Sequence, residues 1–361
     1  MSQRPVCIIG AGISGLVLGR CLLHRDIPAV IYERDTLHQA TNRHTYGITL
    51  HRSAYEPLLN VLGLEESVFR RKVAVDASIG GNGYVSSEHD ETILRANRRW
   101  LEVLLREGLD VRWEHELAGF IPLQDSSHGI VVGFTNGLEA QGSLVVGADG
   151  PRSRVRHAVS PASEFKILPY AVYNGKRRIS RAEFDAKFAA HLDEVNVIEH
   201  RIGETLLQIS LNDVNETLAS INYVYSRPNA IPEELFDEVG LLTELAQPFS
   251  NIFQVEAMRH DRLLNWLMRS VLVPRADLHS AAASGIVLLG DAAHHAPVLS
   301  SMGADEAIND AVHLAQYIAE TGGQSLKSYC KSKHGGWAEY VATSEAQLAT
   351  MHGSQSSPPR L

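Results

Sequence analysis

The sequence contains few cysteines, no long apolar run and no excess of basic residues. The 361 residues include three cysteines, Cys7, Cys21 and Cys330. Two of them fall in apolar core positions, so no disulfide framework is implied. No uninterrupted apolar span is long enough to cross a bilayer, and no basic region precedes a signal-like apolar stretch at the N-terminus. The formal net charge of −9 argues against nucleic acid as a partner. We therefore expect a soluble cytoplasmic protein, a monomer or a homodimer, without a membrane span.

The chain does contain enough apolar material for a large core. Hydrophobic residues make up 44% of the sequence, which suffices for one large core or two domains. The sequence has no internal repeats. Residues 351–361 are rich in Ser and Pro and are predicted to form a flexible tail.

A glycine-rich turn lies close to the start of the chain. Val6–Ile9 is a short apolar run of the kind that forms a buried parallel strand. Gly10 permits a tight turn out of this strand, and Gly12 lets a pyrophosphate approach the backbone. Gly15 lets the following helix pack close to the sheet. The pattern predicts a dinucleotide-binding turn.

The segment after this turn supports a nucleotide ligand. A helix is predicted over residues 13–24, with its positive end directed at the phosphates. A second strand over residues 29–32 ends in Glu33, eighteen residues after Gly15, where an acid is placed to hydrogen-bond a ribose hydroxyl. A glycine turn without a ligand is the alternative, and the motif by itself does not separate FAD from NAD.

A second motif lies in the middle of the chain. The predicted strand over residues 144–146 leads into Gly147-Ala148-Asp149-Gly150, and Ser153 and Arg156 follow. In isolation this could be a strand-to-helix turn in which Asp149 caps the helix.

A third motif lies near the end of the chain. The apolar run over residues 285–289 predicts a buried strand, and Asp291 follows it within Gly290-Asp291-Ala292-Ala293-His294. We interpret His294 as a packing and hydrogen-bonding residue rather than a base. The neighbouring pair His294-His295 has no further ligand-like spacing nearby, so no metal site is predicted.

In this order and at these distances, the three motifs resemble the FAD-dependent aromatic hydroxylases, single-component flavoprotein monooxygenases with the fold of p-hydroxybenzoate hydroxylase. The resemblance covers roughly residues 5–350. It implies an α/β fold, with a Rossmann-like FAD-binding domain and an inserted, mainly β substrate domain. It also implies that Asp149 holds the structure around the pyrophosphate, and that Asp291 binds the ribityl chain of FAD.

The resemblance extends to weaker matches. Pro297, Gly303 and Ala304 fit the family's loop-to-helix segment, and a helix beginning near Gly303 would direct its amides at the pyrimidine edge of the flavin. Arg43 stands where the family has a basic residue near the cofactor, and Arg98 matches an arginine that reaches the pyrophosphate. Each arginine could instead be a solvated helix residue.

The chain departs from the family inside the loop that precedes this helix. The usual pair of glycines is replaced by Ser300 and Ser301, a usual Gln or Glu by Met302, and the usual Asn by Asp305. Glycine suits a backbone that passes close to a ring. An acid at Asp305 would oppose the negative charge of a reduced flavin unless it is turned away as a helix cap. FAD binding is still expected, but the ordinary hydroxylation cycle is open to question.

The motifs divide the chain discontinuously. We predict an FAD-binding domain from residues 1–75, 93–163 and 280–350, and a substrate domain from residues 76–92 and 164–279. In the second, strands are predicted at residues 165–173, 195–202, 205–211 and 217–225, because period-two alternation as in residues 206–211 suits a sheet with one buried face.

Tyr223, Tyr225 and Gln208 are the candidates for residues that contact substrate. They lie on two of the predicted strands, where a phenol or an amide could orient a phenol, an indole or an enol. The alternative is that each is an ordinary sheet residue. No histidine or acid in the insert stands out as a general base.

The sequence therefore predicts an FAD-dependent monooxygenase that uses NADPH or NADH and O2 to hydroxylate, epoxidise or otherwise oxygenate a small organic substrate. Asp261-Arg262 followed by residues 266–270 resembles fungal secondary-metabolite members of the family, which implies an aromatic, polyketide-type or alkaloid-type substrate. The alternative is a flavoprotein of the same fold that has lost oxygen transfer and acts as a non-oxidative cyclase or a ligand-binding protein.

Overall fold

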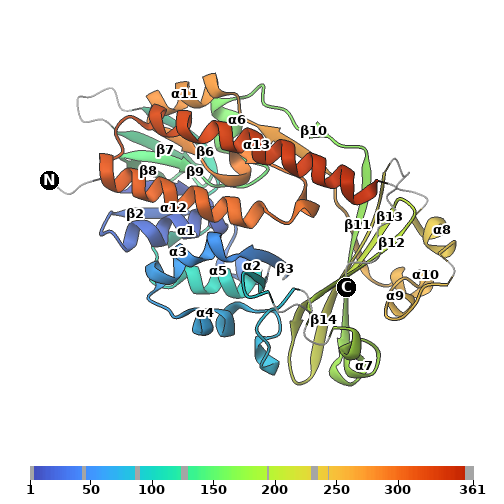
Figure 1. The fold of residues 1–361 in the computed structure, drawn as a ribbon. Coiled ribbons are helices and arrows are strands. Elements are labelled where there is room, and N and C mark those ends of the chain that lie inside the picture. The colour runs from blue at the N-terminus through green and yellow to red at the C-terminus, as the bar shows by residue number, and fades with distance from the viewer. Residues whose placement is uncertain are drawn as a thin grey trace.

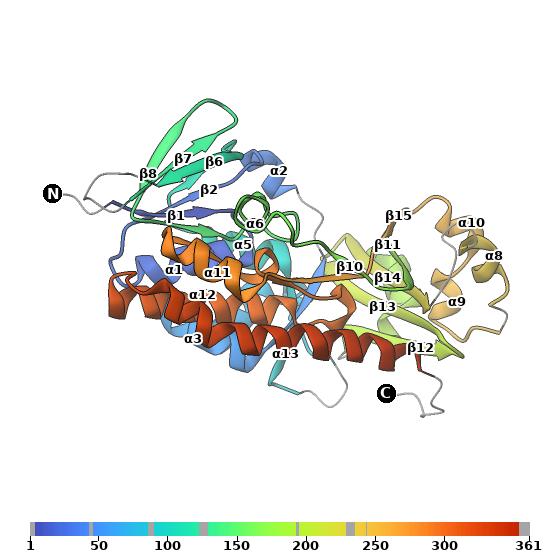
Figure 2. The same cartoon turned by 90° about the horizontal axis from the view of Figure 1, so that it is seen from above.

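The computed structural model describes most of the chain. The described residues are 4–42, 46–85, 90–122, 129–192, 195–228, 235–242 and 244–353. Two sheets lie side by side along the long axis of the molecule, and helices cover both (Figures 1 and 2).

A five-stranded parallel sheet forms the core of the first part. Its strand order is β17-β9-β1-β2-β5, with β17 at Ile286–Leu288, β9 at Leu144–Gly147, β1 at Val6–Ile9, β2 at Ala29–Tyr32 and β5 at Val111–Arg112. The four strands predicted at the three motifs are therefore confirmed as neighbours in one sheet. Each is almost continuously apolar, as expected for strands covered on both faces.

Helices and two small sheets surround this parallel sheet. The predicted first helix is confirmed as α1, Ile13–Leu23, and the predicted late helix as α12, Gly303–Thr321. The remaining elements of this part are α2 (Leu37–Thr41), β3 (Gly47–His51), α3 (Arg52–Leu62), α4 (Glu66–Val73), η1 (Ala77–Ile79), β4 (Ile93–Asn97), α5 (Arg98–Arg106), β6 (Leu117–Pro122), β7 (Ile130–Phe134), β8 (Glu139–Gly142) and α6 (Arg154–Val159). Strands β3 and β4 pair antiparallel, and so do β6, β7 and β8.

An antiparallel sheet dominates the second part. Its strand order is β12-β13-β14-β11-β15, with β12 at Val197–Ile202, β13 at Thr205–Val214, β14 at Leu218–Pro228, β11 at Tyr170–Ser180 and β15 at Arg262–Asn265. The strands predicted at residues 195–202, 205–211 and 217–225 are confirmed as β12, β13 and β14. The strand predicted at residues 165–173 is wrong as one element, because it is divided between a two-residue strand at Lys166–Ile167 in another sheet and the start of β11. One face of the sheet packs on short helices that lie on the side away from the parallel sheet (Figure 1), namely α7 (Arg181–Lys187), η2 (Ala189–His191), α8 (Leu235–Gly240), α9 (Phe249–Ile252) and α10 (Val255–Met258).

The chain passes between the two parts several times. A small three-stranded sheet consists of β10 (Lys166–Ile167), β16 (Arg269–Leu272) and β18 (His294–His295). Three short helical elements complete the described chain: α11 (Arg275–Ala283), η4 (Gly290–Ala292) and η5 (Val298–Ser300). Residues 76–85 also lie against the insert, because Asn196 donates a hydrogen bond from its backbone N to the carbonyl oxygen of Tyr84 and another from Nδ2 to Asp76 Oδ2. Since each part also has its own apolar core, we propose the predicted division of the chain into two domains.

The last helix joins the two parts. Helix α13, Leu326–His352, runs from beside α11 and α12 to the antiparallel sheet (Figures 1 and 2). At its end, His352 is buried and its Nε2 lies 2.7 Å from the hydroxyl of Ser226 in β14. The predicted boundary of a flexible tail at residue 351 is therefore wrong, because Met351 and His352 belong to a packed helix; residues 354–361 lie outside the described residues.

One buried carboxylate connects the third motif to the two long helices. Asp310 in α12 is 0% exposed. Its Oδ2 accepts hydrogen bonds from the backbone N of Gly290 at 3.0 Å and from Nε2 of His294 at 2.6 Å, and its Oδ1 accepts one from Nε1 of Trp337 in α13 at 2.8 Å. Burial raises the pKa of Asp310, but His294, Lys333 and Trp337 together lower it by more, so the pKa lies below its ordinary value. The ionised carboxylate fixes the turn that carries Asp291.

We predict that Asp310→Ala lowers the free energy of unfolding by about 3–5 kcal/mol, because three buried donors lose their acceptor. Asp310→Asn should cost less, since one oxygen acceptor is retained. The matched control is Asp110→Asn, which breaks the exposed pair between Asp110 and Arg112 and should change the free energy by about 0–1 kcal/mol. Urea unfolding of the three variants measures this, and an Asp310→Ala midpoint equal to that of the control would contradict it.

Candidate functional site

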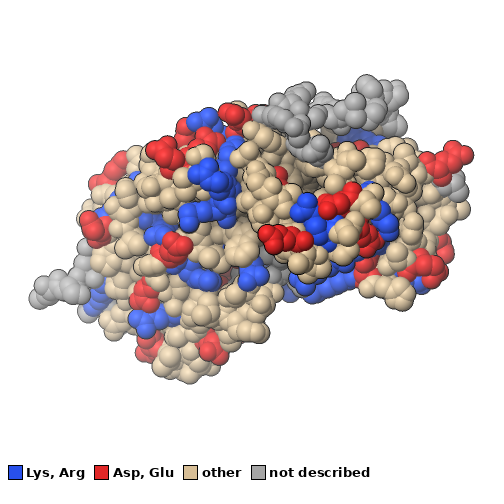
Figure 3. Space-filling view, turned by 90° about the horizontal axis from the view of Figure 1, so that it is seen from below, with Lys and Arg blue, Asp and Glu red and all other residues tan. Residues whose placement is uncertain are grey.

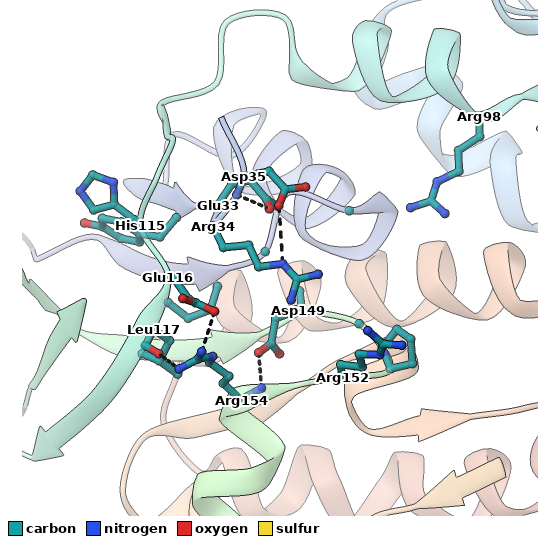
Figure 4. A pocket seen from close by; sticks show the side chains of 17 residues that line it. Glu33, Arg34, Asp35, Arg98, His115, Glu116, Leu117, Asp149, Arg152 and Arg154 are labelled. Atoms are coloured by element: carbon teal, nitrogen blue, oxygen red, sulfur yellow. Dashed lines mark hydrogen bonds and ion pairs between the residues drawn. The ribbon is translucent and has the colours of Figure 1, made fainter. Parts of the chain in front are cut away.

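The three motifs meet at one edge of the parallel sheet. Ile9 at the end of β1 and Leu288 at the end of β17 both pair with Gly147 at the end of β9. The carboxyl ends of these parallel strands therefore point to the same side, where open α/β sheets bind ligands. A pocket of about 370 Å³ opens there (Figure 4), and its lining includes Gly10, Gly12, Glu33, Arg98 and Asp149.

The glycines of the first motif leave room in different ways. Gly10 has a φ of +109°, and a Cβ there would lie 2.5 Å from the carbonyl oxygen of Ala148, so the turn itself needs glycine. A Cβ at Gly15 would lie 2.0 Å from the carbonyl oxygen of Gly10. A Cβ at Gly12 would meet nothing within 4 Å. The described protein thus does not explain glycine at this position, whereas a phosphate lying against the backbone would.

Glu33 braces the glycine turn from the end of β2. It is buried, and its Oε2 accepts a hydrogen bond from the backbone N of Ala11 at 2.7 Å, while Oε1 accepts one from the backbone N of Asp35 at 3.1 Å. The carboxylate thus holds its own turn in shape while it lines the pocket.

Asp149 caps a helix and also presents an unused acceptor. Its Oδ2 accepts hydrogen bonds from the backbone N of Arg154 at 2.7 Å and of Val155 at 3.3 Å, at the start of α6. Its Oδ1 is buried and accepts no hydrogen bond within the described residues. Burial raises the pKa of Asp149. The capping alternative considered for this motif is thus part of the structure, but it occupies only one oxygen.

The trailing Ser and Arg of the second motif have distinct structural roles. Ser153 caps α6, because its hydroxyl accepts a hydrogen bond from the backbone N of Arg156 at 2.8 Å. The guanidinium of Arg156 donates from Nη1 to the carbonyl oxygens of Asp291 and Ala292, both at 3.2 Å, and from Nη2 to that of Pro151. Arg156 therefore ties the second motif directly to the third.

The carboxylate of Asp291 remains accessible to a ligand. Its side chain is 41% exposed, and Oδ1 lies 3.1 Å from Nδ1 of His295. Burial raises the pKa of Asp291, but the contact with His295 and the charges of His295, His294 and Arg98 lower it by more, so it lies below its ordinary value. The carboxylate is a ready acceptor at neutral pH.

Arg98 projects into the pocket from the first turn of α5. Asn97 caps this helix by accepting hydrogen bonds from the backbone N of Arg99 and of Trp100. The guanidinium of Arg98 donates from Nε to Glu102 at 2.8 Å and from Nη1 to the hydroxyl of Tyr46. Arg98 is therefore not a freely solvated helix residue. Arg43, the other predicted arginine, lies outside the described residues.

Three further arginines line the pocket and were not predicted from the sequence. Figure 4 shows Arg34, Arg152 and Arg154 around it, beside Glu33 and Asp149. Arg154 pairs with Glu116 at 2.6 Å, and Arg34 lies 3.7 Å from Asp35. Arg34 directly follows Glu33, and Arg152 and Arg154 follow Asp149-Gly150. Their positions beside two motifs are the sequence signal from which these arginines could have been predicted. Together with Arg98 they make the pocket suitable for a diphosphate.

The altered loop is built differently at its two serines. Ser300 is buried in the short helix η5, and its hydroxyl donates to the carbonyl oxygen of Pro297 at 2.9 Å. Ser301 has a φ of +59°, in the left-handed region, where a side chain is strained and glycine is not. Met302 packs near Tyr340 and Val341, and Gly303 and Ala304 open α12. Of the two serines, Ser301 therefore has the backbone conformation that favours glycine, and Ser300 lies in a short helix.

We predict that Ser301→Gly raises the free energy of unfolding by up to about 1 kcal/mol, because the left-handed backbone is relieved of its Cβ. Ser300→Gly should lower it by about 1 kcal/mol or more, since a buried hydrogen bond and helical backbone order are lost. Urea unfolding of this matched pair measures both effects. Equal shifts of the same sign would contradict the assigned backbone conformations.

Asp305 in the first turn of α12 is directed at His51, at the end of β3. Asp305 is buried, and its Oδ1 accepts a hydrogen bond from the backbone N of His51 at 3.0 Å. Its Oδ2 lies 2.5 Å from Nδ1 of His51. This hydrogen bond raises the pKa of His51 above its ordinary value of 6.5, against the opposing effect of partial burial. Protonated His51 neutralises the carboxylate, so the acid does not leave an unpaired negative charge at this helix end.

The His51–Asp305 pair predicts a pH-dependent contribution to stability. A raised pKa means that the contribution is fully present below about pH 6.5 and is lost as the pH rises through the folded-state pKa. The destabilisation caused by His51→Gln should therefore be larger at about pH 6 than at about pH 9. Urea midpoints at both pH values measure this, with the exposed His24→Gln as control. A His51→Gln effect that grows with pH would contradict the predicted sign.

Two of the predicted substrate residues lie on the wrong face of the antiparallel sheet. Tyr223 and Tyr225 are each 1% exposed and pack in the apolar core beneath α7–α10. The hydroxyl of Tyr223 donates to Asp261 at 2.8 Å and that of Tyr225 to Glu238 at 2.7 Å. The prediction that these tyrosines face a substrate is therefore corrected. They are structural residues of the insert.

Gln208 lies on the other face of the sheet, which we call the inner face. Residues of this face contact the first part of the molecule: Ser210 meets Arg95 of β4, and Val172 and Val224 pack with Leu299. Gln208 itself is near the edge strand, and its Nε2 donates to Glu199 at 2.8 Å. Its role toward a substrate stays a proposal.

Other classes of site have little support in the described residues. Among them, no group of three or more His, Cys, Asp or Glu side chains is arranged to hold a metal ion, and no helix is long and apolar enough to span a membrane. On the face shown in Figure 3, the side chains of Lys and Arg are interspersed with those of Asp and Glu.

Comparison with known proteins agrees with this site. A family model described as an FAD binding domain matches residues 3–332. The FAD-dependent monooxygenase aptC of Emericella nidulans is 33% identical over an alignment that covers 89% of this chain and 87% of that protein. The FAD-dependent monooxygenase nscC of Aspergillus fumigatus is 30% identical over an alignment that covers 97% of this chain and 96% of that protein.

A solved structure shares the fold. The crystal structure of CtdE in complex with FAD and substrate 4 superposes with a TM-score of 0.76 and 13% identity, over 97% of this chain and 90% of that one. At this identity, the likeness is one of fold alone.

Proposed function

We propose that this protein uses FAD, a nicotinamide donor (NADPH or NADH) and O2 to oxygenate a small organic substrate. The proposal starts from its family, because the chain belongs to the FAD-dependent monooxygenases. We further propose an aromatic, polyketide-type or alkaloid-type substrate of secondary metabolism. The observation that carries the cofactor assignment is that the strands of three separate motifs end side by side at one edge of the parallel sheet. The first two motifs line a pocket there, together with Arg34, Arg98, Arg152 and Arg154.

The residues present fit FAD. Gly12 leaves an open backbone, and Oδ1 of Asp149 is a buried acceptor without a partner in the described protein. In our proposal Glu33 holds the adenosine ribose, Arg98 the pyrophosphate and Asp291 the ribityl chain. When bound, FAD supplies hydride acceptance from a nicotinamide and activation of O2 for transfer of one oxygen atom.

The first turn of α12 supplies the electrostatic environment for the ring. Its unpaired backbone amides at Gly303 and Ala304 carry a partial positive charge that favours negative charge nearby. Asp305 would oppose this effect, but its carboxylate is held by His51. This contact weakens the electrostatic reason for the alternative, a flavoprotein without oxygen transfer.

The electron donor is proposed to bind only transiently. No second glycine fingerprint follows residue 150, so the chain offers no separate Rossmann domain for a nicotinamide dinucleotide. We propose that NADPH or NADH docks between the two parts of the molecule. Tight stoichiometric binding of NADPH to oxidised protein without substrate would argue against this.

Asp291→Ala should weaken FAD binding roughly 10- to 150-fold, because a charge-assisted hydrogen bond is worth about 1.5–3 kcal/mol. The variant should purify with less than one FAD per chain and remain folded. Asp291→Asn is the matched control and should retain more FAD, since it keeps one acceptor oxygen. Flavin absorbance per chain together with far-ultraviolet circular dichroism measures this, and full FAD occupancy in Asp291→Ala would sink the assignment.

The proposed activity is tested by mixing the purified holoprotein with NADPH, and separately with NADH, under nitrogen. Bleaching of the flavin absorbance followed by reoxidation on admission of air supports an oxygenase. A yellow protein that neither donor bleaches, with or without an extract of the producing cells, would favour the alternative, a non-oxidative cyclase or a ligand-binding protein.

A further inference from the structure

The pair formed by His51 and Asp305 joins a base that solvent can reach to an acid that is buried. Both oxygens of Asp305 are directed at His51: Oδ1 accepts the hydrogen bond from its backbone N at 3.0 Å, and Oδ2 lies 2.5 Å from Nδ1 of its imidazole. The side chain of Asp305 is 6% exposed, whereas that of His51 is 40% exposed. The imidazole can therefore exchange a proton with solvent while its partner stays in place.

The contact also determines which nitrogen of His51 titrates. An ionised carboxylate only accepts hydrogen bonds, so Nδ1 of His51 carries a hydrogen in both protonation states of the ring. The proton that His51 gains or loses is therefore the one on Nε2. When Nε2 is protonated the pair is neutral, and when Nε2 is not protonated the pair has one negative charge.

The pair lies in the first turn of α12, beside the turn that carries Asp291. A Cβ at Gly290 would lie 3.6 Å from Cβ of Ala307 in α12 and 2.5 Å from Oγ of Ser14 in α1. The start of α12 is therefore at the same edge of the parallel sheet as Asp291 and the first glycine turn. In the proposed function, the free amides of this turn face the ring of FAD.

Two more acids follow on the same helix, and both have cations of their own. Glu306 comes directly after Asp305, and burial and the charge of Asp310 raise the pKa of Glu306. His294 lies 2.6 Å and Lys333 lies 3.6 Å from Asp310. The same two cations also act on Glu306. The partner of Asp305 comes from β3 instead.

The other charged groups around His51 belong to α3, to β4 and to the segment before β4. Arg52 of α3 lies 3.2 Å from Glu66, and Arg95 of β4 donates to the hydroxyl of Thr49. Asp90, before β4, raises the pKa of His51, but the hydrogen bond to Asp305 has the larger effect. His51 is thus the group at this helix end whose protonation compensates Asp305.

We propose that His51 takes up one proton from solvent when the flavin is reduced and so compensates the negative charge that reduction leaves beside Asp305. This inference rests on the proposed function. Hydride transfer breaks a C–H bond of the nicotinamide, oxidises it, and adds two electrons and one proton to the ring, which gains one negative charge. The second proton binds Nε2 of His51, so the net charge of the site is unchanged. His51 is a positioning residue that acts through Asp305.

Electrostatics gives the sign of this coupling. A new negative charge near the pair raises the pKa of His51 further, because it favours the protonated imidazole. Between the pKa of His51 in the oxidised and in the reduced protein, reduction therefore takes up two protons for two electrons. Outside this range it takes up one. The midpoint potential should fall with pH twice as steeply inside the range as outside it, and the range lies above pH 6.5 because Asp305 raises the pKa of His51.

The test measures the midpoint potential of the holoprotein from about pH 6 to about pH 10, with dithionite and redox dyes in the absence of a nicotinamide and O2. Wild-type protein should show the twofold steeper segment. His51→Asn should lose it, because the amide N of asparagine can still donate to Asp305 but does not titrate. The exposed His24→Asn is the control and should keep it. A steep segment that persists in His51→Asn would assign the second proton to another group, the ring included, and overturn the proposal.

Asp305→Asn tests the partner. Removing the carboxylate lowers the pKa of His51, so the steep segment should move to lower pH. A segment at the same pH as in wild type would show that Asp305 does not set the titration of His51, which contradicts the proposal.

A titration of wild-type protein does not depend on how the variants fold. Nuclear magnetic resonance of holoprotein with isotope-labelled histidine should give a higher pKa for His51 in the reduced than in the oxidised state. Equal values would overturn the proposal. Because dithionite supplies the electrons, a protein that neither NADPH nor NADH bleaches would refute the proposed function and leave this measurement valid, whereas equal pKa values would refute this inference alone.

Discussion

The carboxylate of Asp310 is the contact on which the geometry of the site depends. It accepts hydrogen bonds from the strand-end turn at Gly290, from His294 and from Trp337 of the last helix. Gly290 and His294 belong to one stretch of chain and Trp337 to another, and the carboxylate joins both stretches to α12. Because the carboxylate is fully buried, its ionised form is tolerated only while all three donors remain in place. The position of Asp291 therefore depends on how α12 and α13 pack against the turn that contains Gly290 and His294.

Much of the fold was predictable because its signals are local. Gly15 is required by the carbonyl oxygen of Gly10 five residues earlier, and Gly10 has a φ of +109°, which favours glycine. The strands beside Asp149 and Asp291 are short apolar runs. The same applies to the start of α12 at Gly303. The roles of Ser153 and Arg156 could be anticipated only as a pattern, since the carbonyl groups that Arg156 contacts come from another motif.

The inward and outward faces of β14 could not be predicted. Residues 219–226 of this strand are all buried, because one face packs on helices and the other on the first part of the molecule. Without an alternation of polar and apolar residues, the sequence does not show which face a tyrosine occupies. The contact between His51 and Asp305 joins residues 254 positions apart, and such a pair carries no signal in a single sequence. The sequence shows that Asp305 differs from the family's usual Asn, but it does not show that His51 is the partner of this acid.

Helix α13 limits how the two parts of the molecule can move. Its first half is held through Trp337 at Asp310, and its last residue is held through His352 at Ser226 of the antiparallel sheet. A helix of 27 residues is about 40 Å long and stiff, so it keeps these two anchor points at a fixed separation. Any movement of one part relative to the other must therefore keep these two anchor points about that far apart or break one of the two contacts.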